Sequence, residues 1–163
     1  MFQRVELSNL AGRARDVDFP DRVAVGQVRR ALRDQRFVLA FQPVVFSSDP
    51  GRAAYHEGLI RMIDETGQII PARQFVDVVE QTELGRQIDC MALDMGLAAL
   101  RRDQGLRLAI NMSARSIGHA RWAETLMAGL RGRITGDGGV IEMALADAKK
   151  AVMTIALPLA GVM

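Results

Sequence analysis

The sequence predicts an α/β fold with a largely parallel sheet. Runs of β-branched and aromatic residues, each of strand length, alternate with segments in which apolar residues recur at helical spacing. The chain has 163 residues, of which 49% are hydrophobic and 25% charged, and this suits one globular domain. We expect residues 1–20 to be an irregular lead-in and residues 21–163 to form the domain.

The first half of the domain is predicted to begin with a helix that carries Val28 and Leu32 on one side and arginines on the other. A mostly buried strand follows, with Gln42 as its polar position. The next helix has a proline near its start, where proline is favoured. In chain order the elements are a helix over residues 25–36, strands over 37–46 and 53–63, and a helix over 71–80.

The second half is predicted to add the longest amphipathic helix, which Gly105 ends. Ser113 is a candidate N-cap for the helix after it. In chain order we expect a helix over residues 88–102, a strand over 106–112, a helix over 113–131, a glycine-rich connection over 131–139, a short strand over 140–144 and a helix over 146–156.

Composition excludes several classes of protein. The net charge is only +2, so we expect no basic patch and no nucleic-acid partner. Cys90 is the single cysteine, which excludes an internal disulfide and a cysteine-rich zinc site. The longest uncharged stretch, residues 151–163, is shorter than the about 20 residues of a membrane span. We therefore expect a cytoplasmic protein without a membrane partner.

Three polar residues lie in or at the ends of predicted strands: Glu57, Asn111 and Glu142. The carboxyl ends of parallel strands meet at one edge of a sheet, and ligand sites form there. Two carboxylates and an amide oxygen at that edge would suit Mg²⁺, Mn²⁺ or Ca²⁺. The alternative is that each carboxylate lies on a solvated face and that the asparagine belongs to a turn.

Several motifs resemble those of the EAL domain family, the cyclic-di-GMP phosphodiesterases. HEGLIR resembles the family signature Glu-x-Leu-x-Arg, with Gly58 where alanine is usual. The similar segments occur in family order and together cover roughly residues 25–118. They are FQPVV at 41–45, HEGLIR at 56–61, IIPARQFVDVVEQTELGRQID at 69–89 and AINMSARSI at 109–117.

The resemblance implies a modified (β/α)₈ TIM-type barrel with its site at the carboxyl ends of the strands. It implies that Glu57 and Asn111 bind Mg²⁺ or Mn²⁺, with Glu142 as a counterpart of a third ligand. Such a metal lowers the pKa of bound water and holds a phosphodiester oxygen. The resemblance assigns no catalytic residue here, and the dinucleotide contacts that it implies are Gln42, Leu59 and Arg61.

The sequence also departs from the family pattern. Ala144 and Leu145 stand where the family has a threonine and a second glutamate, and no Asp-Asp pair occurs in the 163 residues. A (β/α)₈ barrel takes about 250 residues. We therefore expect an incomplete barrel, truncated after about the fourth or fifth strand.

Three functions are compatible with these features. The first is a regulatory, catalytically degenerate EAL-type domain that binds a protein partner, a second copy of itself or, weakly, cyclic-di-GMP, and is inactive as an isolated chain. The second is an active metal-dependent phosphodiesterase that forms linear pGpG once another chain completes its site. The third is an interaction module without a ligand.

Overall fold

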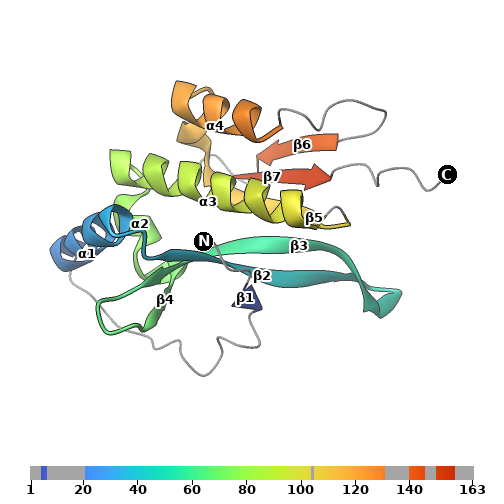
Figure 1. The fold of residues 1–163 in the computed structure, drawn as a ribbon, viewed down its shortest axis with the longest axis horizontal. Coiled ribbons are helices and arrows are strands. Elements are labelled where there is room, and N and C mark those ends of the chain that lie inside the picture. Colours follow the sequence, from blue (N-terminus) through green and yellow to red (C-terminus); the bar gives the residue numbers. More distant parts are fainter. Residues whose placement is uncertain (1–4, 7–20, 104, 131–139, 146–149, 157–163) are drawn as a thin grey trace.

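The computed structural model describes residues 5–6, 21–103, 105–130, 140–145 and 150–156 (Figure 1). A seven-stranded sheet has the strand order β1-β2-β3-β5-β7-β6, with β4 paired to β3. No helix in these ranges combines the length and the apolar character needed to cross a membrane. The strands are β1 (Val5–Glu6), β2 (Phe37–Phe46), β3 (Asp49–Ile63), β4 (Ile69–Pro71), β5 (Arg107–Ser113), β6 (Val140–Leu145) and β7 (Lys150–Ala156). The helices are α1 (Asp21–Arg33), α2 (Val76–Val79), α3 (Glu83–Arg102) and α4 (Ala120–Leu130), with short 3₁₀ turns at Ala72–Gln74 and Ala114–Ser116.

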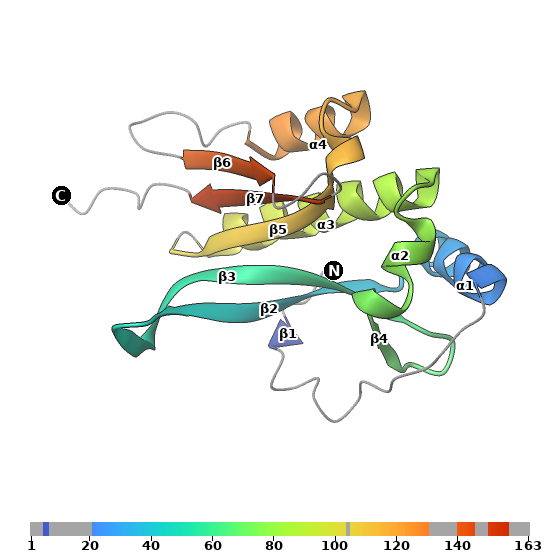
Figure 2. The same cartoon turned by 180° about the vertical axis from the view of Figure 1, so that it is seen from behind.

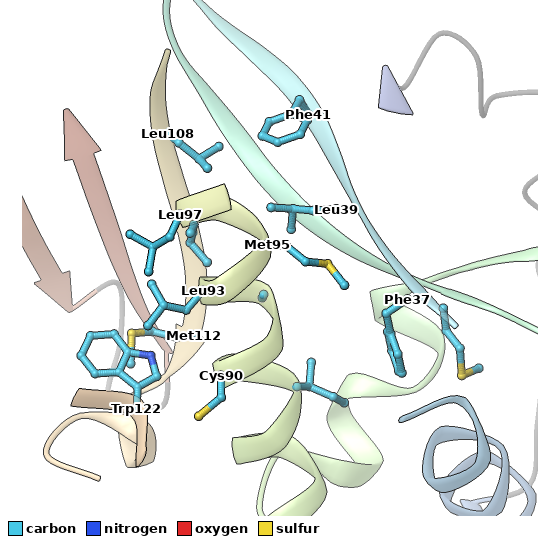
Figure 3. Packing of buried hydrophobic residues seen from close by; sticks show 14 of the residues in the cluster. Phe37, Leu39, Phe41, Cys90, Leu93, Met95, Leu97, Leu108, Met112 and Trp122 are labelled. Carbon is cyan, nitrogen blue, oxygen red and sulfur yellow. The ribbon is translucent and has the colours of Figure 1, made fainter. Parts of the chain in front are cut away.

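The core lies between α3 and one face of the sheet (Figure 3). Successive side chains of a strand point to opposite faces, so alternate residues of β2, namely Phe37, Leu39 and Phe41, are buried on the side of α3. From β5, Leu108 and Met112 join the same cluster. The other face of these strands is therefore left for a different set of side chains.

Helix α3 is the central helix of this core. It begins after Thr82, whose hydroxyl accepts a hydrogen bond from the backbone N–H of Leu84 at 3.2 Å and so caps the helix. Gly96 faces β5, where a Cβ would stand 2.3 Å from Cδ1 of Ile110. The absence of a side chain at this glycine lets the helix approach the strand closely.

The sheet is mixed, so the expectation of a largely parallel sheet is wrong. Strands β2 and β3 form an antiparallel hairpin, and only β1–β2 and β3–β5 pair in parallel. Strand β7 runs antiparallel to both β5 and β6 (Figure 2). Short connections favour antiparallel neighbours, because a parallel pair needs a long crossover.

The prediction of a last helix over residues 146–156 is also wrong. Residues 150–156 form β7, while 146–149 lie outside the described residues. This segment contains Val152, Thr154 and Ile155, which are β-branched and favour strands. A short apolar run does not distinguish a strand from a helix by periodicity alone.

Several predicted boundaries shift. The segment 71–80 divides into the end of β4, a 3₁₀ turn and the single turn of α2, and α3 begins five residues before its predicted start at residue 88. Ser113 caps the 3₁₀ turn at Ala114–Ser116, and α4 begins only at Ala120. Within the predicted lead-in, Val5 and Glu6 pair with Ala40 and Phe41 of β2.

The burial of α3 predicts a large effect of truncating Leu93, which is 0% exposed. Leu93→Ala is expected to lower the free energy of unfolding by about 2–5 kcal/mol, because lost burial and a cavity both add to the cost. Met127→Ala removes a side chain that is 59% exposed and is expected to change it by less than about 0.5 kcal/mol. Urea unfolding followed by circular dichroism measures both, and equal effects would contradict the packing described.

Candidate functional site

Five of the predicted site residues come from the three strands β2, β3 and β5 and lie on one face of the sheet, opposite α3. In the β2–β3 hairpin, Gln42 stands directly across from Glu57, and Ala40 from Leu59. Residues directly opposite each other share a face, and so do residues two apart along a strand. The members of this face are Gln42, Glu57, Leu59, Arg61 and Asn111.

Glu57 and Asn111 are in direct contact although 54 residues separate them in the chain. The Nδ2 amide of Asn111 donates a hydrogen bond to Oε1 of Glu57 at 2.5 Å. The parallel pairing of β3 with β5 brings them together, because it sets Glu57 beside Ala109, two residues before Asn111. The predicted proximity of this pair is present in the structure.

Arg61 lies two residues after Leu59 on β3, on the same face of the sheet, and is partly buried. Burial lowers the pKa of its guanidinium below the ordinary value, the like charge of Arg73 lowers it further, and Glu57 opposes both. Its Nη1 donates to the backbone carbonyl of Ile60 at 3.0 Å. The site therefore holds a partly desolvated cation, and a guanidinium in such a place binds phosphate oxygens well.

A cavity of about 350 Å³ opens beside Asn111, between the carboxyl ends of β3 and β5 and helices α2 and α3. Its wall is mostly apolar, with Val76, Ile88 and Met112 among its residues. Arg73, Asp77, Glu80 and Asp89 supply its charges. A concave apolar wall with a few polar groups is typical of a small-molecule site.

Asp89 connects α3 to the end of β5. Its Oδ2 accepts hydrogen bonds from the backbone N–H of Ser113 at 2.9 Å and from the hydroxyl of Ser116 at 2.6 Å. Burial raises the pKa of this carboxyl from 3.8 to about 6, a rise that the two serine hydrogen bonds reduce and the charge of Glu80 increases. The carboxyl thus holds the segment just after Asn111.

Asp89 and Arg73 were missed by the reasoning from sequence. The available signal for Asp89 was its position, four residues after Gly85 and three before Ala92 on the buried side of a helix. A carboxylate in an apolar stripe needs hydrogen-bond partners, which predicts contact with a neighbouring element. Arg73 follows the buried Ile70 and Pro71 closely, but spacing alone does not indicate its proximity to Arg61.

The backbone of Glu142, the third residue predicted for this edge, lies two strands away from Asn111. Glu142 lies on β6 opposite Thr154 of β7, and β7 in turn pairs with β5. Two strand spacings place the backbone of Glu142 about 10 Å from β5. The cause is the β6–β7 hairpin, whose second strand occupies the position next to β5.

The donor set at the contact is one carboxylate and one amide. No group of three or more His, Cys, Asp or Glu side chains suited to a metal occurs among the residues that the structure describes. Mg²⁺ is nevertheless often held by one or two carboxylates together with phosphates of the substrate. Glu57 and Asn111 therefore fit a hard cation that is shared with a phosphate.

Comparison with known proteins relates this chain to EAL domains. The family model described as EAL domain matches residues 25–151. The signaling protein YkoW of Bacillus subtilis (strain 168) is 37% identical over 92 residues, which are 54% of this chain and 11% of that protein. A solved complex of the PaMucR phosphodiesterase with c-di-GMP is 28% identical, with a TM-score of 0.56 over 66% of this chain and 45% of that one.

A second solved structure shows the similarity of fold alone. The FimX EAL domain from Pseudomonas aeruginosa, bound to c-di-GMP, is 23% identical, with a TM-score of 0.56 over 66% of this chain and 43% of that one. The chain thus spans less than half of each of these structures and about a tenth of the curated relative.

The raised pKa of Asp89 predicts a pH-dependent stability. The folded chain binds the proton more tightly than the unfolded one, so this carboxyl's contribution to the free energy of unfolding is fully present below pH 3.8 and is lost as pH rises through about 6. Asp89→Asn keeps a neutral acceptor and is expected to flatten the stability profile between these values. Asp94→Asn, an exposed change on the same helix, is the control, and an unchanged slope in Asp89→Asn would contradict the assignment.

Proposed function

The chain belongs to the EAL domain family, and we propose that it is a domain of cyclic-di-GMP signalling that binds the dinucleotide without hydrolysing it as an isolated chain. The observation that carries the proposal is the single sheet face shared by Gln42, Glu57, Leu59, Arg61 and Asn111, with Glu57 and Asn111 in contact. These are the family's binding positions by resemblance, and their grouping requires the strand pairing described above.

In this proposal some residues of the face contact the dinucleotide and others bind the metal. Arg61 binds a phosphate of the dinucleotide through its guanidinium, and its partial burial strengthens that interaction. Leu59 and Gln42 contact the ligand from neighbouring positions of β3 and β2. Glu57 and Asn111 hold Mg²⁺ or Mn²⁺ beside the phosphate. A bound divalent metal would polarise the phosphodiester and lower the pKa of a coordinated water.

The position of Glu142 supports the proposed lack of hydrolysis. Two-metal hydrolysis places ions about 3.5–4 Å apart, where they stabilise both the attacking and the leaving oxygen. Strand β7 lies between β5 and β6, so the backbone of Glu142 is two strand spacings away from β5. We therefore expect Glu57 and Asn111 to orient a phosphate but to be too few for an efficient hydrolytic centre.

A second candidate is a phosphodiesterase whose site is completed by another chain. The Glu57–Asn111 contact favours it, because both groups are already in place for a metal. It predicts that linear pGpG appears only when a protein partner or a second copy is present. An interaction module without a ligand is the third outcome, and it predicts no binding of the dinucleotide.

Calorimetric titration with cyclic-di-GMP in Mg²⁺, in Mn²⁺ and in a chelator tests the proposal, with chromatography of the products. We expect binding without pGpG, and a weaker affinity in the chelator. Arg61→Ala is expected to weaken binding by about tenfold or more, which corresponds to about 1.4 kcal/mol. Glu57→Ala is expected to remove the effect of the metal.

Arg107→Ala is the matched control, because Arg107 lies on the same strand as Asn111 but at its opposite end. It should bind the dinucleotide as the unchanged chain does. Turnover by the isolated chain would identify an enzyme and refute the proposed lack of hydrolysis. Equal losses of affinity for cyclic-di-GMP in Arg61→Ala and Arg107→Ala would refute the proposed binding site.

A further inference from the structure

A groove runs along the outer side of the helices, away from the face that carries Glu57 and Asn111. It has a volume of about 820 Å³ and is bounded by α1 and α4, with α3 as its floor. Figure 1 shows α1 and α4 at the two sides of α3. We call it the arginine groove, after Arg29, Arg33, Arg101 and Arg121.

The helical period explains how the groove forms. Helix α3 buries Leu93 and Leu97 in the core, and Leu84, Met91 and Asp94 are among its residues that line the groove. Leu84, Gln87, Met91 and Asp94 recur at intervals of three and four along α3, so they form one stripe, whose apolar members Leu84 and Met91 also pack against the core. The groove is therefore a second face of the same helix.

The charge of the groove is concentrated. Four guanidiniums and one carboxylate, Asp94, line it, which is a formal sum of +3. Counting Asp34, which pairs with Arg33, lowers this sum to +2, as much as the whole chain carries. The net charge of the whole chain therefore does not describe the charges that line this groove. Arg33 pairs with Asp34, but within the described part of the chain no ion pair involves Arg29 or Arg121, which are both exposed.

We propose that the arginine groove binds an acidic, amphipathic helix of a protein partner. Two helices over the floor of a third form a channel into which a helix can lay its apolar side. Leu84, Met91 and Ala128 offer apolar contacts there, and the arginines at the rim meet carboxylates. Complementary charge of this kind guides association and selects the partner.

The composition of the groove favours a protein over a nucleic acid. None of its lining residues is aromatic, whereas single-stranded nucleic acids are bound by stacking on aromatic rings. Methionine and arginine are enriched in protein interfaces, and the groove contains both. The apolar floor would also have no partner in a phosphate backbone.

The test uses the full chain and a labelled peptide of about 18 residues, roughly five helical turns, built from Leu, Ala and Glu with the leucines on one side. Fluorescence anisotropy measures its binding at about 0.05 M and 0.5 M salt. We expect saturable binding that weakens with salt. Three comparison probes are a scrambled peptide of the same composition, the same helix with Gln for Glu, and an oligothymidine of similar charge.

The double variant Arg29→Glu/Arg121→Glu is expected to weaken binding of the acidic helix by about tenfold or more. Arg107→Glu makes the same change outside the groove and should leave it unaffected. Thermal melts of each variant establish folding, and binding of cyclic-di-GMP should not differ among them. Absent or non-saturable binding, equal binding of the scrambled peptide or of the oligothymidine, or equal losses in the double variant and Arg107→Glu would each overturn the proposal.

Discussion

The packing of α3 on one face of the sheet is the constraint on which the other features depend. Because strand side chains alternate, burying Leu39, Phe41 and Leu108 against α3 turns the intervening residues to the opposite face. Gln42 and Glu57 are therefore on the free face as a result of the core. A slip of one residue in any of these strands would exchange core and site together.

The packing of α3 also determines which of its residues line the arginine groove. The turns that bury Leu93 and Leu97 also place Met91 and Asp94 along the arginine groove. Asp89 belongs to the same helix and holds the segment that follows Asn111 through Ser113 and Ser116. One helix thus contacts the core, the end of the site strand and the outer groove.

Much of this arrangement could be predicted from the sequence up to about residue 118. The apolar runs over β2, β3 and β5 are long and flanked by turn residues, and the Glu57–Asn111 contact follows once those strands lie side by side. The tail could not be predicted in the same way, because the periodicity of a short apolar run does not distinguish a strand from a buried helix. The grouping of Arg29 with Arg121 joins two helices that are distant in sequence, and net charge carries no information about it.

Strand β7 also affects the circumference of any barrel that this sheet could form. Neighbouring strands lie about 4.8 Å apart, and the diameter of a closed barrel grows with the number of its strands. A barrel that closed through β6 would include β7 in its wall, because β7 lies between β5 and β6. Its circumference would be about 5 Å larger than that of a barrel in which β6 paired directly with β5. The wall opposite Glu57 would then stand farther away, and a ligand that is held on one wall would keep its other side in water.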